Sequence, residues 1–115
     1  PDEYDSMLGK LFEDGKEPSI GQWQKVAIAR CLYGDARLLI FDEATSSLDA
    51  VAEQHLLKNL KALLPQKSVL MVSHRYSVTR HADYIYVVSQ GRIVQACTHE
   101  ALINSGGEYA RLFRD

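Results

Sequence analysis

The chain has 115 residues, enough for one domain at most, and 46% of them are hydrophobic, an ordinary share for a globular protein. Its net charge of −2 comes from 13 basic and 15 acidic residues without a block of like charge, so we expect no nucleic-acid partner. No apolar run approaches the ~18 residues of a membrane span. The chain starts at Pro1 rather than Met, which suggests a piece of a longer protein. Cys31 and Cys97 are the only cysteines and lie far apart in the sequence, so we expect both to be reduced, buried thiols.

The first predicted helix follows a loop-rich stretch. Residues 1–18 contain glycines that interrupt any long period, so we predict a loop with one short helical turn there. Residues 19–22, SIGQ, match a capping box, in which a serine hydroxyl and a glutamine side chain satisfy each other's backbone amides. A helix is therefore predicted from Ile20 to Tyr33, stopped by Gly34, with one face made by Trp23, Val26, Ala27 and Arg30.

The stretch Leu38 to Asp49, LLIFDEATSSLD, is the centre of the pattern. Its unbroken apolar run, Leu38 to Phe41, predicts a strand buried on both faces. A second helix begins after Asp49, a plausible N-cap, and ends at Pro65. Its apolar face comprises Ala52, Leu56, Leu60, Leu63 and Leu64.

The rest of the chain is predicted to form short elements with short joins. In order these are a strand at 68–73 ending before His74, a short helix or turn at 75–82, a strand at 84–88, a turn at 89–91, an edge strand at 92–96, a helix capped by Thr98 that runs through Ile103, and a terminal face of Tyr109, Leu112 and Phe113. Strands that alternate with helices predict an α/β fold with a mainly parallel sheet.

Two carboxylates, Asp42 and Glu43, stand where the first strand ends. The carboxyl edge of a parallel sheet is where open α/β folds bind ligands. An ATPase needs a hard cation and a group that activates water, and these two acids can divide the tasks, with Asp42 near magnesium and Glu43 as general base. His74 ends another strand and is placed to reach the same edge. A solvent-exposed strand end with surface acids, and a structural histidine, are the alternatives.

The start of the first helix is a candidate anion site. Its free N–H groups and positive dipole end favour an anion, and the Ser19 hydroxyl and Gln22 amide lie beside them. The capping box alone accounts for Ser19 and Gln22. It does not account for Gly21, which is poor in a first helical turn but useful where a ligand must approach the backbone closely.

In this order and spacing, the motifs resemble the carboxyl-terminal half of the nucleotide-binding domain of ABC (ATP-binding cassette) transporters. PSIGQWQKVAIAR resembles the signature motif LSGGQ and its helix, LLIFDE the Walker B strand, SSLD the D-loop and VSHR the switch-histidine loop. The tail, GRIVQACTHEALINSGGEYARLF, is similar to that of exporters. Pro18 and Ile20 depart from the signature, and Cys97 stands at a usual glycine position.

This resemblance implies roles for the candidate residues. Ser19, Gly21 and Gln22 would contact the γ-phosphate of ATP held by a second nucleotide-binding domain in a head-to-tail dimer. Asp42 would hold Mg²⁺ through water, Glu43 would polarise the attacking water and His74 would sense the γ-phosphate. Asp49, with Ser47, would bridge to the partner's phosphate loop. The chain would work with transmembrane domains at the cytoplasmic face of a membrane.

The resemblance also implies a P-loop NTPase, RecA-like core that is incomplete here. Residues 1–36 would belong to the helical subdomain, and residues 37–115 to the core and the carboxyl-terminal tail. No GxxxxGK[ST] pattern, the Walker A loop, occurs in the 115 residues. We therefore expect the isolated chain to be inactive, with unpaired strand edges.

The leading interpretation is part of an ATP hydrolase that drives export across a membrane. One alternative is the carboxyl-terminal lobe of a split-head chromosome-organising or DNA-repair ATPase, which shares the motifs and would explain the missing loop. Residues 2–18 show no sustained heptads, which argues against it. The other alternative is a non-catalytic segment.

Overall fold

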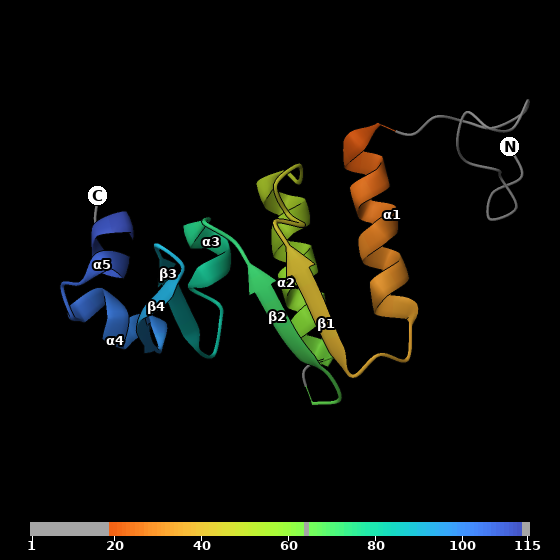
Figure 1. Cartoon of the computed structure of the whole chain (residues 1–115). Coiled ribbons are helices and arrows are strands. Elements are labelled where there is room, and N and C mark those ends of the chain that lie inside the picture. Colours follow the sequence, from red (N-terminus) through yellow and green to blue (C-terminus); the bar gives the residue numbers. More distant parts are fainter. Residues whose placement is uncertain (1–18, 64, 114–115) are drawn as a thin grey trace, which may run out of the picture. The chain divides into compact units, whose positions relative to one another are not determined.

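The computed structural model describes residues 19–63 and 65–113, which form two compact units divided between Met71 and Val72. The turn predicted within residues 1–18, Pro18 and Leu64 lie outside the described residues. In chain order, and as labelled in Figure 1, the elements are α1 (Ile20–Tyr33), β1 (Leu38–Asp42), α2 (Ala50–Leu63), β2 (Ser68–Val72), α3 (Tyr76–Thr79), β3 (Ile85–Ser89), β4 (Arg92–Cys97), α4 (His99–Asn104) and α5 (Glu108–Phe113).

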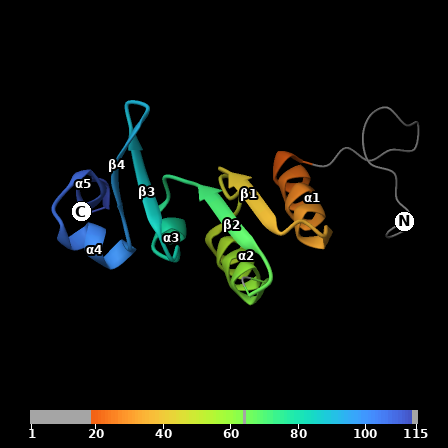
Figure 2. The ribbon, with the colours of Figure 1, turned by 60° about the horizontal axis from the view of Figure 1, so that its bottom comes forward.

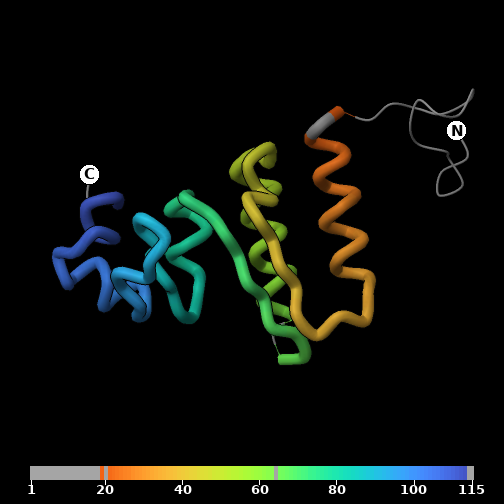
Figure 3. The backbone as a smooth tube through the Cα atoms, viewed as in Figure 1, coloured from red at the N-terminus to blue at the C-terminus, as the bar shows by residue number. Residues whose placement is uncertain are grey.

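The first unit is built on a strand–helix–strand crossover. β1 and β2 pair in a two-stranded sheet and run in the same direction (Figure 1). Parallel strands need a crossover connection, and α2 supplies it along one face of the sheet (Figure 2). Figure 3 follows the backbone along β1, through a tight turn into α2, and back along β2. The predicted strand, helix and strand are confirmed here.

One apolar core holds this unit together. The predicted apolar face of α2 is confirmed, since Leu56 and Leu60 are buried and Ala52 is partly buried. Glu53 and Leu57 are buried as well. The core cluster consists of Ile28 of α1, Leu39 and Phe41 of β1, Leu48, Leu56 and Leu60. It fixes α1 and the turn after β1 relative to the sheet.

Two predicted faces were wrong. β1 is buried on one face only: Leu39 and Phe41 are 3% exposed, but Leu38 and Ile40 are 53% and 58% exposed, because α2 covers a single face. In α1 the residues Trp23, Val26, Ala27 and Arg30 are exposed. The residues of α1 that face the core are instead Gln24, Ile28 and Leu32. Because Gln24 is polar, the helical spacing of apolar residues on this face is not evident in the sequence.

The second unit contains a hairpin covered by short helices. β3 and β4 pair antiparallel, with Ile85 opposite Cys97 and an irregularity between Val87 and Val88. The strands are joined by Gln90 and Gly91, both with positive φ (48° and 73°), as a two-residue type I′ turn requires. The core is formed by Ile85, Val87, Leu102 and Tyr109.

The sheets and cysteines differ in part from expectation. The described residues hold one parallel and one antiparallel strand pair, whereas the sequence predicts a mainly parallel sheet. Cys97 is half-buried, but Cys31 is exposed, so its predicted burial was wrong. Among residues 19–63 and 65–113 we find no helix with the length and apolar content to cross a membrane.

Candidate functional site

The start of α1 has the predicted capping box. The Ser19 N–H donates to Oε1 of Gln22 at 2.8 Å, and the Gln22 N–H donates to Oγ of Ser19 at 3.2 Å. Both bonds use acceptor oxygens, so the hydroxyl hydrogen of Ser19 and the amide hydrogens of Gln22 keep their capacity to donate. Ser19 and Gln22 are both exposed. This helix end can therefore bind an anion without giving up its cap.

The carboxylates at the end of β1 occupy different environments. Asp42 is the last residue of the strand and is exposed, whereas Glu43 is half-buried. Glu43 has φ of 50°, in the left-handed region that non-glycine residues rarely adopt. Such a conformation costs on the order of 1–3 kcal/mol and is concentrated at functional sites. The chain thus turns sharply at the predicted general base.

Two consecutive turns carry the chain from Glu43 into α2. The Ser46 N–H donates to the Glu43 carbonyl at 3.1 Å, and the Leu48 N–H donates to the Thr45 carbonyl at 3.0 Å. Thr45 is 2% exposed and Leu48 is 8% exposed, so the turn is anchored on the core. Ala44 is partly buried against the core, whereas Ser46 and Ser47 are exposed.

Asp49 ends this turn as the N-cap of α2, as predicted. Its Oδ1 accepts from the Ala52 N–H at 2.8 Å, and its carbonyl accepts from the Glu53 N–H at 2.9 Å. Because Asp49 is exposed, its second carboxylate oxygen can contact another group.

The first unit brings the predicted signature residues next to the D-loop. A methyl group at Gly21 would lie 3.8 Å from both the carbonyl oxygen and the Oγ of Ser47. The link between the two segments is Gln24, whose side chain bonds to the turn at Glu43, Ser46 and Ser47. The sequence interpretation missed Gln24. The signal available was its place two residues after Gln22, on the core-facing side of α1.

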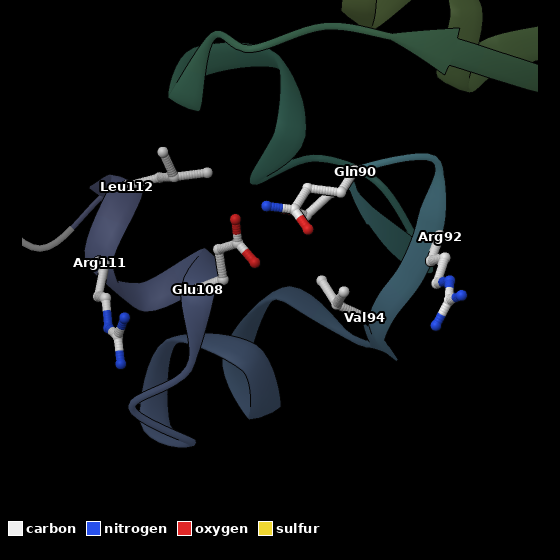
Figure 4. A pocket seen from close by; sticks show the side chains of 7 residues that line it. Gln90, Arg92, Val94, Glu108, Arg111 and Leu112 are labelled. Atoms are coloured by element: carbon white, nitrogen blue, oxygen red, sulfur yellow. The ribbon is translucent and has the colours of Figure 1, made fainter.

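His74 follows β2 and belongs to the second unit. It is exposed, and its predicted role at the site of Glu43 stays a prediction. The second unit also has an open groove beside the hairpin turn, shown in Figure 4. None of the predicted site residues lines it; the lining residues are Ser89, Gln90, Arg92, Val94, Glu108, Arg111 and Leu112.

The site is suited to magnesium only in combination with a phosphate ligand. Within the part of the chain that the structure describes, no three His, Cys, Asp or Glu side chains gather into a metal-binding group. Mg²⁺ is usually bound by one or two carboxylates together with water and substrate phosphates. The exposed Asp42 carboxylate can provide the protein's share of such a shell.

Comparison with known proteins shows which family the chain resembles. Residues 5–46, which include α1, β1 and Glu43, match the family model described as ABC transporter. Across 99% of its length the chain is 42% identical to the ATP-dependent lipid A-core flippase of Burkholderia thailandensis, and 44% identical to that of Nitrosococcus oceani. Both comparisons therefore find this chain similar to part of an ABC transporter.

The ABC relatives are longer than this chain. The chain spans 19% of the length of each of these flippases. Among solved structures, it is similar to a bacterial Atm1-family ABC exporter with ATP bound, with a TM-score of 0.80 and 36% identity. This match covers 84% of the chain and 17% of the exporter chain. The similarity to an exporter structure implies the P-loop NTPase fold, and the relatives favour the exporter interpretation over the split-head ATPase.

Proposed function

We propose that this chain forms part of the ATP-binding and ATP-hydrolysing domain of an ABC exporter and serves to drive transport across a membrane. The observation that carries the proposal is the left-handed turn at Glu43, which follows β1 and brings the backbone carbonyl of Glu43 within hydrogen-bonding distance of Gln24 in α1. The exporter relatives, one of them with ATP bound, support it. The phosphate-binding loop and the rest of a RecA-like core would come from outside these 115 residues.

Glu43 acts as the general base in this proposal. Its carboxylate orients the attacking water and accepts its proton as the bond from the water oxygen to the γ-phosphorus forms and the bond from that phosphorus to the ADP leaving group breaks. Asp42, one residue earlier and exposed, holds Mg²⁺ through water. A Mg²⁺ ion bound there would neutralise charge on the phosphates. Half-burial of Glu43 limits its contact with bulk water, while exposed Asp42 stays open to a hydrated cation.

The signature residues bind ATP from across a dimer interface. Ser19, Gly21 and Gln22 offer a hydroxyl, a bare backbone and an amide at the positive end of a 14-residue helix. ATP held by a second nucleotide-binding domain, packed head to tail, is the anion we propose for them. Ser47 and Asp49, exposed on the adjoining turn, contact that domain's phosphate loop.

The remaining proposals concern the role of His74 and the place of the domain at the membrane. His74, exposed at the carboxyl end of β2, senses the γ-phosphate once the domain is assembled. The domain works with transmembrane domains at the cytoplasmic face of the cell membrane. These proposals follow the family named by the comparisons.

The test replaces Glu43 by Gln in the full-length protein and measures ATP hydrolysis and ATP binding with magnesium present. Loss of a general base lowers turnover by roughly 10²-fold or more and leaves binding intact. Glu100→Gln, an exposed change at the start of α4, is the matched control and leaves both unchanged. Wild-type turnover in the Glu43→Gln protein would show that the carboxylate is not the base.

A further inference from the structure

The Gln24 side chain joins the first turns of α1 to the segment that carries Glu43. Its Nε2 lies 3.4 Å from the Glu43 carbonyl oxygen and 3.4 Å from the Oγ of Ser46. Its Oε1 accepts from the Ser47 N–H at 3.2 Å and also from the Ser47 hydroxyl. One amide thus contacts both ends of the turn between Glu43 and Ser47.

The orientation of this amide is fixed by backbone groups. The Ser47 N–H can only donate and the Glu43 carbonyl can only accept, so Oε1 must face Ser47 and Nε2 must face Glu43. Only a side chain with a donor and an acceptor at this reach satisfies both groups. Glutamate offers acceptors alone, and methionine, of similar length, offers no strong donor or acceptor.

The position of Gln24 in α1 is fixed by packing against the core. It is half-buried and lies one helical turn before Ile28, which is 7% exposed in the core of the first unit. The backbone it contacts at Glu43 is in the left-handed region, where a conformation persists only if its surroundings hold it. The Gln24 bond, with the Ser46 N–H bond to the same carbonyl, provides that hold.

We propose that Gln24 is a positioning residue, which fixes the backbone of Glu43 and Ser47 relative to the start of α1 and so aligns the base with the ATP-contacting residues. The inference rests on the proposed function, in which Glu43 is the general base. Gln24 acts through Glu43 and contacts no ATP itself. Its loss therefore lowers kcat and leaves KM for ATP nearly unchanged.

The experiment compares variants of the full-length protein in ATP hydrolysis. Gln24→Met lowers kcat by about 10-fold to 10²-fold, as expected for a misplaced reacting group, with KM within about twofold of wild type. Gln24→Glu lowers kcat to a similar degree, because it keeps the acceptor for Ser47 but loses the donor to Glu43. Gln54→Met, an exposed change on α2, is the control and leaves kcat unchanged.

A double variant separates positioning from a general loss of structure. If Gln24 acts through Glu43, adding Gln24→Met to Glu43→Gln lowers the residual rate no further, since the two effects are not additive. A further drop of the same size as in the single variant, or a wild-type kcat in Gln24→Met, overturns the inference. An unchanged rate in Glu43→Gln alone overturns the proposed function instead, so the two failures are distinct.

Discussion

Gly21 lies next to Ser47, and the space between them is large enough for a methyl group. A methyl group at Gly21 would be 3.8 Å from the Ser47 carbonyl oxygen, an ordinary van der Waals distance. Packing within the described residues therefore does not require glycine here. Glycine within a helix costs roughly 0.5–1 kcal/mol relative to alanine. A reason for this glycine must lie beyond the described residues, and the ATP of the proposed partner domain is such a group.

Gly21→Ala should separate stability from activity. In the full-length protein we expect the midpoint of thermal unfolding to stay the same or rise slightly, because alanine favours the helix. ATP hydrolysis should fall by about 10-fold to 10²-fold, since a displacement of about 1 Å at the phosphate is enough for this. Unfolding curves and initial rates on the same preparations measure both effects.

Gly34→Ala is the matched control at the other end of α1. Its φ of −74° suits alanine, and a methyl group there would meet nothing closer than 3.7 Å. We expect unchanged hydrolysis and unchanged unfolding. Full activity in the Gly21→Ala protein would remove the argument for a close ligand at that helix end.

Asp49 combines a helix cap with a proposed contact to the second domain, and two substitutions distinguish them. Asp49→Asn keeps the oxygen that accepts from the Ala52 N–H, so stability should hold; Asp49→Ala removes it and should cost about 1 kcal/mol. Both should lower ATP hydrolysis if the carboxylate contacts the partner. Denaturant unfolding and hydrolysis rates provide the two measurements.

Thr98→Ala serves as the control for a lost cap. Thr98 caps α4 in the second unit through the Ala101 N–H. We expect it to lower stability without changing hydrolysis. A wild-type rate in the Asp49→Asn protein would mean that Asp49 is a cap and nothing more.

Local signals in the sequence were sufficient for the helix starts. Ser19 with Gln22, and Asp49 three residues before Ala52, are short-range patterns whose hydrogen bonds close within one turn. The apolar period of α2 likewise predicted Leu56 and Leu60 as core. These features depend on neighbours in the sequence and so can be predicted from it.

The missed features depend on contacts between distant segments. Gln24 meets a turn about twenty residues further along, and its place two residues after Gln22 does not by itself reveal that contact. The left-handed backbone of Glu43 is likewise imposed by its surroundings, since glutamate has no preference for positive φ. The one-sided burial of β1 depends on which elements cover the sheet, and an apolar run does not encode that.

Tyr109 should prove to be the main polar anchor of the second unit. Its hydroxyl lies 2.8 Å from Nδ1 of His99 and 3.2 Å from Oγ1 of Thr79, and its side chain is 2% exposed. Tyr109→Phe leaves these partners without the hydroxyl and should lower stability by about 1–3 kcal/mol. Denaturant unfolding of the full-length protein measures the change.

Tyr84→Phe provides the comparison for Tyr109. The Tyr84 hydroxyl reaches the Ala96 carbonyl at 3.3 Å, but this side chain is 52% exposed, so water can replace the bond. We expect a change within about 0.5 kcal/mol. Equal effects at the two tyrosines would contradict the anchoring role of Tyr109.

The turn at Gln90 and Gly91 has a consequence for how the chain folds. Its two left-handed residues already have the twist of the strands they join, and the loop to be closed is two residues long. Hairpins of this kind form in about 1–10 μs. β1 and β2 can pair only after the chain has crossed through the 14-residue α2. We therefore expect the hairpin to pair faster than β1 and β2, although it follows them in the sequence.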